Sequence, residues 1–130
     1  MTSAPAQPNP KWMTVVGWIL SVLPCLMLFF SAYMKLSRNP QAVDGFKNLH
    51  YPDGSLMPIG IAELACTIIF LVPQTAVLGA VLLTGYLGGA TATHVIGGQS
   101  IHMPVLFGVV LWFALFFRDP RIRALLPLRR

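Results

Sequence analysis

Charged and catalytic residues are both scarce in this chain. Lys, Arg, Asp and Glu together make up 10% of its 130 residues, against 55% hydrophobic residues. A small soluble domain cannot bury so much apolar surface, which favours a membrane protein of one domain. The two cysteines, Cys25 and Cys66, lie inside apolar runs without a C-x-x-C or metal-type spacing, which favours inert buried thiols and predicts no metal site. No nucleophile–base pair, metal cluster or phosphate loop is visible, so the sequence identifies no catalytic residue and is more typical of a protein that is not an enzyme on its own.

The charges that are present flank apolar segments. The formal net charge is +5, but basic residues placed beside apolar runs are typical of membrane orientation, so we do not expect binding to nucleic acid. One stretch, residues 58–94, holds a single formal charge, Glu63. As one helix it would extend about 55 Å, well beyond a hydrocarbon core of about 30 Å. The proline in Val72-Pro73-Gln74-Thr75 predicts that residues 58–94 fold back on themselves as two antiparallel helices.

The whole pattern predicts an all-α membrane protein, an antiparallel bundle of four transmembrane helices with a short interfacial helix between spans 1 and 2. The expected parts are a disordered tail over residues 1–12, a membrane domain over 13–117 with spans at about 13–34, 57–72, 75–96 and 103–117, and a basic tail over 118–130. Asn39-Pro40 is an N-cap with proline at the first helical position, and Val43, Phe46 and Leu49 give the interfacial helix one apolar face. Lysine and arginine are more numerous on the side of the termini, which predicts that both termini are cytoplasmic.

Polar residues are expected to gather on the opposite, outer side. They come to one depth because Lys35 ends span 1, Glu63 lies about 8 Å into span 2 at ~1.5 Å per residue, and the others close span 3 or open span 4. The residues are Lys35, Glu63, Thr91, His94 and His102. An ionised side chain within a span is costly, so Glu63 should pair with the nearest cation, Lys35. That pair is either part of a binding site or a lock between two helices.

Helical spacing adds to this cluster. Thr84, Leu87, Thr91 and His94 follow a 3-4-3 pattern on one face, and Tyr86 lies on the adjacent stripe with Thr93. The small residues Gly85, Gly88 and Gly89 either permit close helix packing or leave room for a flat ligand beneath Tyr86.

Several motifs together resemble the DoxX-like family of small four-span bacterial membrane proteins. They are Met34-Lys35-Leu36, Tyr51-Pro52, Gly60-Ile61-Ala62-Glu63-Leu64 and the run from Gly85 to His94. His50 stands where the resemblance leads us to expect glycine, and Val95-Ile96 replaces an expected basic residue. The resemblance implies a four-helix bundle of the bacterial inner membrane and a loose link to quinone and thiol oxidoreductase complexes.

Two main hypotheses follow. In the first, the protein is a binding or accessory subunit whose ligand-binding residues are Lys35, Glu63, Tyr86, Thr91, His94 and His102. The ligand would be a quinone or another small lipophilic molecule, and the partners the lipid bilayer with a membrane oxidoreductase or a second copy of the chain. In the second, the protein is a small-solute or proton-coupled permease, which the lack of internal repeats and broken spans disfavours. A purely structural membrane subunit is the remaining alternative.

Overall fold

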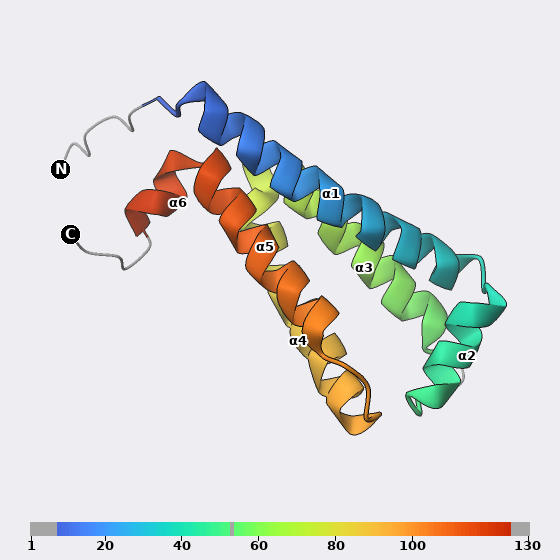
Figure 1. Cartoon of the computed structure of the whole chain (residues 1–130). Helices are drawn as coiled ribbons and strands as arrows, with labels where there is room; N and C mark the ends of the chain where they lie inside the picture. The colour runs from blue at the N-terminus through green and yellow to red at the C-terminus, as the bar shows by residue number, and fades with distance from the viewer. Residues whose placement is uncertain (1–7, 53, 126–130) are drawn as a thin grey trace.

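The computed structural model describes residues 8–52 and 54–125, and these residues form helices joined by short turns (Figure 1). In chain order the elements are α1 (Lys11–Leu36), α2 (Pro40–Asn48), α3 (Leu56–Leu71), the 3-10 turn η1 (Pro73–Thr75), α4 (Ala76–Ile96), α5 (His102–Arg118) and α6 (Pro120–Leu125). The predicted break lies where proline was expected to place it, because Val72 is extended and Pro73 opens η1.

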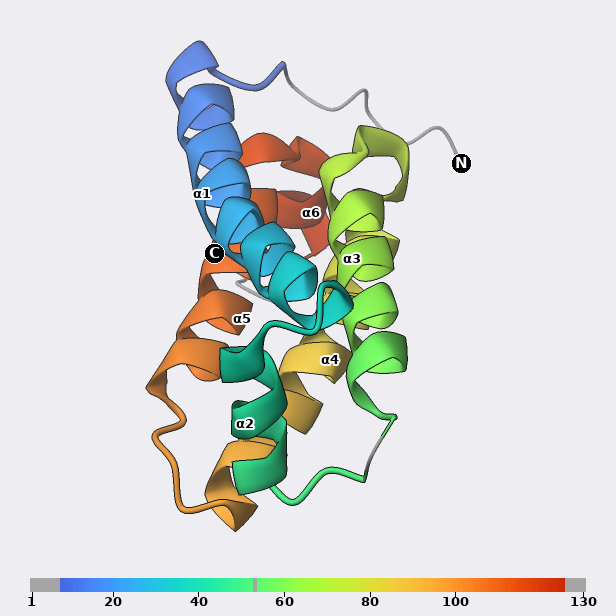
Figure 2. The same cartoon turned by 90° about the vertical axis from the view of Figure 1, so that its right-hand side faces the viewer.

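The four long helices form a ring. α1 packs against α3 and α5, and α4 packs against the same two helices from the other side. Figures 1 and 2 show α2 at one end of this ring, and α6 with the start of α1 at the opposite end. The core between the helices is apolar and includes Phe70, Leu83, Leu111 and Leu115, each less than 2% exposed.

Two segments are long and apolar enough to cross a membrane, Lys11–Leu36 and Pro73–Ile96. The other two apolar helices are shorter, with 16 residues in α3 and 17 in α5. Large apolar side chains cover the outward faces of all four, for example Phe30 on α1, Ile61 on α3, Val81 on α4 and Phe113 on α5, each more than half exposed. Contiguous exposed apolar surface of this kind is typical of a protein in contact with lipid.

A residue in the left-handed backbone conformation follows the end of three of the helices. Arg38 (φ 53°), His50 (φ 62°) and Gly98 (φ 69°) each follow a helix C-cap. At the end of α2 the His50 N–H donates to the Lys47 carbonyl and the Tyr51 N–H to the Phe46 carbonyl, which is the Schellman pattern. Glycine is favoured in that conformation, which explains why it is the residue expected at position 50.

Two glycines allow the helices to approach closely. A Cβ at Gly17 would lie 2.4 Å from the Cβ of Arg118, and one at Gly79 would lie 2.3 Å from the Phe70 backbone. Gly85, Gly88 and Gly89 were interpreted as positions that either permit close packing or leave room for a ligand, and a Cβ at any of them would meet no heavy atom of the described chain within 4 Å. The contacts of Gly17 and Gly79 bring α1 close to α5 and α3 close to α4, at two positions that the sequence did not single out.

Both predicted tails include helical residues where they are described. α1 begins at Lys11, inside the predicted disordered tail, and Asn9 donates a hydrogen bond of 2.9 Å to the Phe117 carbonyl; residues 1–7 lie outside the described part. Residues 120–125 of the predicted basic tail form α6, and residues 126–130 lie outside the described part.

Arg118 was predicted to belong to that surface tail, and its guanidinium instead lies between the helices. Nη1 donates to Ser21 Oγ of α1 at 2.8 Å, and Nη2 donates to the Phe70 carbonyl of α3 at 2.9 Å. The guanidinium also lies 4.3 Å from the ring centroid of Trp18. Arg118 satisfies a carbonyl at the end of α3 that has lost its helical partner, and so ties α5 to two neighbours.

Candidate functional site

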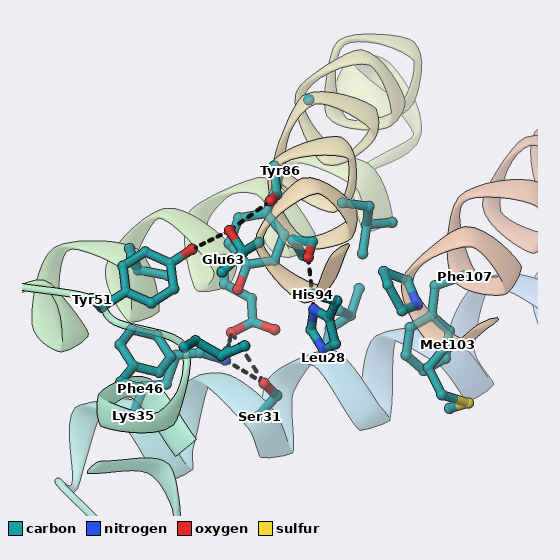
Figure 3. A pocket seen from close by; sticks show the side chains of 18 of the residues that line it. Leu28, Ser31, Lys35, Phe46, Tyr51, Glu63, Tyr86, His94, Met103 and Phe107 are labelled. Carbon is teal, nitrogen blue, oxygen red and sulfur yellow. Dashed lines mark hydrogen bonds and ion pairs between the residues drawn. The ribbon is translucent and has the colours of Figure 1, made fainter. Parts of the chain in front are cut away.

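A cavity of about 450 Å³ lies at the α2 end of the bundle (Figure 3). All four long helices and the α2 region contribute to its wall. The lining residues are Met27, Leu28, Ser31, Lys35, Phe46, Leu49, Tyr51, Ile59, Glu63, Gly85, Tyr86, Leu87, Gly89, Ala90, Thr93, His94, Met103, Pro104 and Phe107. Its volume is within the usual range for small-molecule sites.

An ion pair forms the polar part of this wall. Lys35 Nζ lies 2.7 Å from Glu63 Oε2, and the two side chains are only 11% and 2% exposed. Ser31, one turn before Lys35 on α1, donates to the same carboxylate oxygen at 3.3 Å. The predicted contact between Lys35 and Glu63 is therefore present, with a serine as a third member.

Gly60 brings the two helices of the ion pair together. It lies one turn before Glu63 on the same face of α3, and a Cβ there would come within 3.0 Å of the Lys35 Cβ. The short Lys35 to Glu63 distance therefore depends on the absence of a side chain at position 60.

His94 and Tyr86 line the cavity from α4. His94 Nδ1 lies 2.6 Å from the Ala90 carbonyl oxygen. A carbonyl only accepts hydrogen bonds, so Nδ1 carries a proton, and in the neutral form of the ring Nε2 keeps its lone pair. No residue of the described chain is hydrogen-bonded to Nε2. His94 and the ion pair together place polar groups in an otherwise apolar wall.

The region after α2 covers the end of the cavity, and sequence reasoning missed its role. The Thr93 hydroxyl donates to the Gly89 carbonyl at 2.9 Å, so at the 2.9 Å contact with Tyr51 the phenol is the donor. The Tyr51 ring stacks on Phe46 at a centroid distance of 4.7 Å. The sequence predicted one apolar face for the helix over Val43, Phe46 and Leu49, but Tyr51 was singled out only as part of the Tyr51-Pro52 motif.

The cavity brings together most of the residues singled out in the sequence, though not all. It is lined by Lys35, Glu63, Tyr86 and His94, and by Gly85 and Gly89. Thr91, His102 and Gly88 are not among its lining residues.

The phase of α4 explains why Thr91 is absent. The part of α4 that faces the cavity is centred on Tyr86, Ala90 and Thr93 and ends at Leu87 and His94, whereas Thr91 lies just beyond this edge and bonds to the carbonyl of Leu87. Thr84 accepts a hydrogen bond of 2.8 Å from Trp112 Nε1 of α5. His102 is exposed at the start of α5 and contacts Ser100.

The cavity offers no metal site within the described residues, because no three His, Cys, Asp or Glu side chains come together there. Its wall suits an amphiphilic organic molecule. Apolar side chains from α1, α3 and α5 surround most of it, and the ion pair and His94 supply the polar groups.

Comparison with known proteins assigns the family. The model of the DoxX-like family matches residues 19–117, more than half of the chain, so the chain belongs to the DoxX-like family and is a small membrane protein. None of the curated proteins and none of the solved structures matches the chain.

Proposed function

We propose that this member of the DoxX-like family is a four-span protein of the bacterial cytoplasmic membrane that binds a small lipophilic molecule in the cavity at its α2 end. A quinone is one such molecule, and the protein would hold it for a membrane oxidoreductase. The observation that carries the proposal is the buried Lys35 and Glu63 pair in the wall of a largely apolar cavity of about 450 Å³.

The helix lengths and surfaces support four spans. At ~1.5 Å per residue, α3 and α5 extend roughly 24–26 Å, which crosses most of a hydrocarbon core of about 30 Å. Their exposed apolar side chains match those of α1 and α4, and the four helices pack as one antiparallel ring. The ends that carry Lys11, Arg118, Arg121 and Arg123 lie on the same side, which favours a cytoplasmic position for that side.

The distribution of lining residues supports a lipophilic ligand. Met27 and Leu28 of α1 and Met103 and Phe107 of α5 form an apolar wall, and methionine adapts readily to the shape of a ligand. The polar groups are Ser31 and Lys35 near the end of α1, Glu63 of α3 and His94 of α4. A molecule with an apolar body and a compact polar head matches this division.

Two glycines of α4 allow a matched test. Gly89 lines the cavity and its neighbour Gly88 does not, although a Cβ at either would meet no described atom within 4 Å. Gly89→Leu should therefore fill the cavity, and Gly88→Leu should place the same side chain elsewhere. Leucine is favoured over glycine within a helix by about 1 kcal/mol, so neither change should unfold the protein.

The experiment compares organic extracts of the wild type and both variants by mass spectrometry after purification in detergent. We expect a lipophilic molecule in near-stoichiometric amount with wild type and Gly88→Leu, and its loss from Gly89→Leu at an unchanged melting temperature. Equal retention by both variants, or no such molecule in the wild type, would show that the cavity is not a binding site.

A further inference from the structure

The carboxylate of Glu63 has one oxygen in use and one available. Oε2 accepts from Lys35 Nζ and from Ser31 Oγ. Oε1 makes no geometrically defined hydrogen bond within the described chain, although the Tyr86 hydroxyl lies near enough to interact with the carboxylate. Every fully buried polar side-chain atom described there has a hydrogen-bond partner. Oε1 is therefore not sealed inside the protein, and it reaches the surface of the cavity that Glu63 lines.

His94 supplies a second available acceptor. Its Nδ1–H is directed to the Ala90 carbonyl, so in the neutral form of the ring the Nε2 lone pair is left for an occupant of the cavity. Figure 3 shows the Glu63 carboxylate turned toward the space between Lys35 and His94. The two acceptors thus lie on facing helices, α3 and α4, at the same end of the cavity.

The formal charges of this end cancel. Lys35 and Glu63 are the only charged residues among those that line the cavity, and they neutralise one another at 2.7 Å. The site therefore has no net charge to attract an anionic or cationic head. A neutral head that reaches Oε1 of Glu63 and Nε2 of His94 must donate a hydrogen bond to them.

We propose that the occupant carries a hydroxyl group, as an alcohol, phenol or hydroquinone does, and that the site selects it over the corresponding ether or ketone. This inference rests on the proposed binding function and specifies its ligand class. An ether or ketone only accepts hydrogen bonds, so it cannot donate to Glu63 or His94, and the donors in the same wall, Lys35 Nζ and the Tyr86 hydroxyl, are directed to Glu63. Sites built to hydrogen-bond a ligand hydroxyl discriminate strongly against analogues that lack it.

The test uses two probes that differ in one group, para-heptylphenol and para-heptylanisole. Their affinities are measured by titration calorimetry in detergent, with Gly89→Leu as the measure of partition into the micelle alone. We expect wild type to bind the phenol at least about tenfold more tightly than the anisole. His94→Leu, which removes one acceptor, should reduce that ratio several-fold.

Two further variants separate a lost contact from a damaged fold. His94→Gln keeps an acceptor oxygen and should retain most of the preference for the phenol. Thr91→Val changes a residue of α4 outside the cavity wall and should leave both affinities unchanged. Equal affinity of wild type for the two probes, or an unchanged ratio in folded His94→Leu, would overturn the hydroxyl preference alone. If neither probe binds wild type, the proposed binding function fails together with this inference.

Discussion

The ion pair between α1 and α3 should show strong coupling when its members are replaced. Lys35 and Glu63 are 2.7 Å apart and nearly inaccessible, so removal of one partner leaves a charge with little access to water. Breaking a buried pair in this way costs about 3–5 kcal/mol. Because Lys35 keeps 11% exposure and can reach toward the polar end, we expect about 3 kcal/mol for Glu63→Gln. A similar cost is expected for Lys35→Met, since only hydroxyl groups, such as that of Ser31, are then left to donate to the carboxylate.

The double variant should be more stable than either single variant, because it buries no unpaired charge. The assay is thermal unfolding of the four proteins in the same detergent. At a few degrees per kcal/mol for a chain of this size, each single variant should melt roughly 10 °C below wild type and the double variant within about 5 °C of it. Additive changes would mean that the two side chains do not interact, and would refute the reasoning for the site as well.

Three other outcomes are expected. Arg118→Leu should cost about 2–3 kcal/mol in thermal unfolding, because it removes charged hydrogen bonds to α1 and α3; Arg118→Lys should not restore them, because lysine lacks the forked geometry. Gly79→Ala should destabilise the protein, since its Cβ would lie 2.3 Å from the backbone of α3, whereas Gly85→Ala, with open space, should leave the melting temperature unchanged or raise it. If both termini are cytoplasmic, a cysteine at Gly98 but not at Ser3 should react with an impermeant thiol reagent in intact cells, in a background without the two native cysteines; the reverse pattern would contradict the orientation.

The helical architecture and the ion pair could be predicted from the sequence because each follows from a local rule. Proline lacks the N–H that a helix interior needs, so a proline that follows a helical segment ends it. The break between α3 and α4 is found at Pro73. Glu63 is the only charge in a long apolar run, so its need for a partner is independent of the detailed packing. Lys35 was the nearest cation, and the structure places it on Glu63.

The helical phase of α4 could not be predicted in the same way. Threonines occur on both of its stripes, Thr84 and Thr91 on one and Thr93 on the other, so composition does not distinguish them. The positions of α3 and α5 decide how far around α4 the cavity wall extends, so that it includes Leu87 and His94 but not Thr91, and these positions are set by tertiary contacts. The buried position of the Arg118 guanidinium could not be predicted for a related reason. An arginine beside an apolar segment has the same local sequence pattern whether its side chain points to water or between helices.

Photo-crosslinking from two positions of α5 tests the central claim most directly. Phe107 lines the cavity, whereas Phe113 is 54% exposed on the outer surface of the same helix. With p-benzoylphenylalanine at position 107, irradiation of the protein in native membranes should give one lipophilic adduct of defined mass by intact-protein mass spectrometry. The same group at position 113 should give a mixture of membrane phospholipids. The same phospholipid mixture from both positions would contradict the account, because the cavity would then hold no ligand of its own.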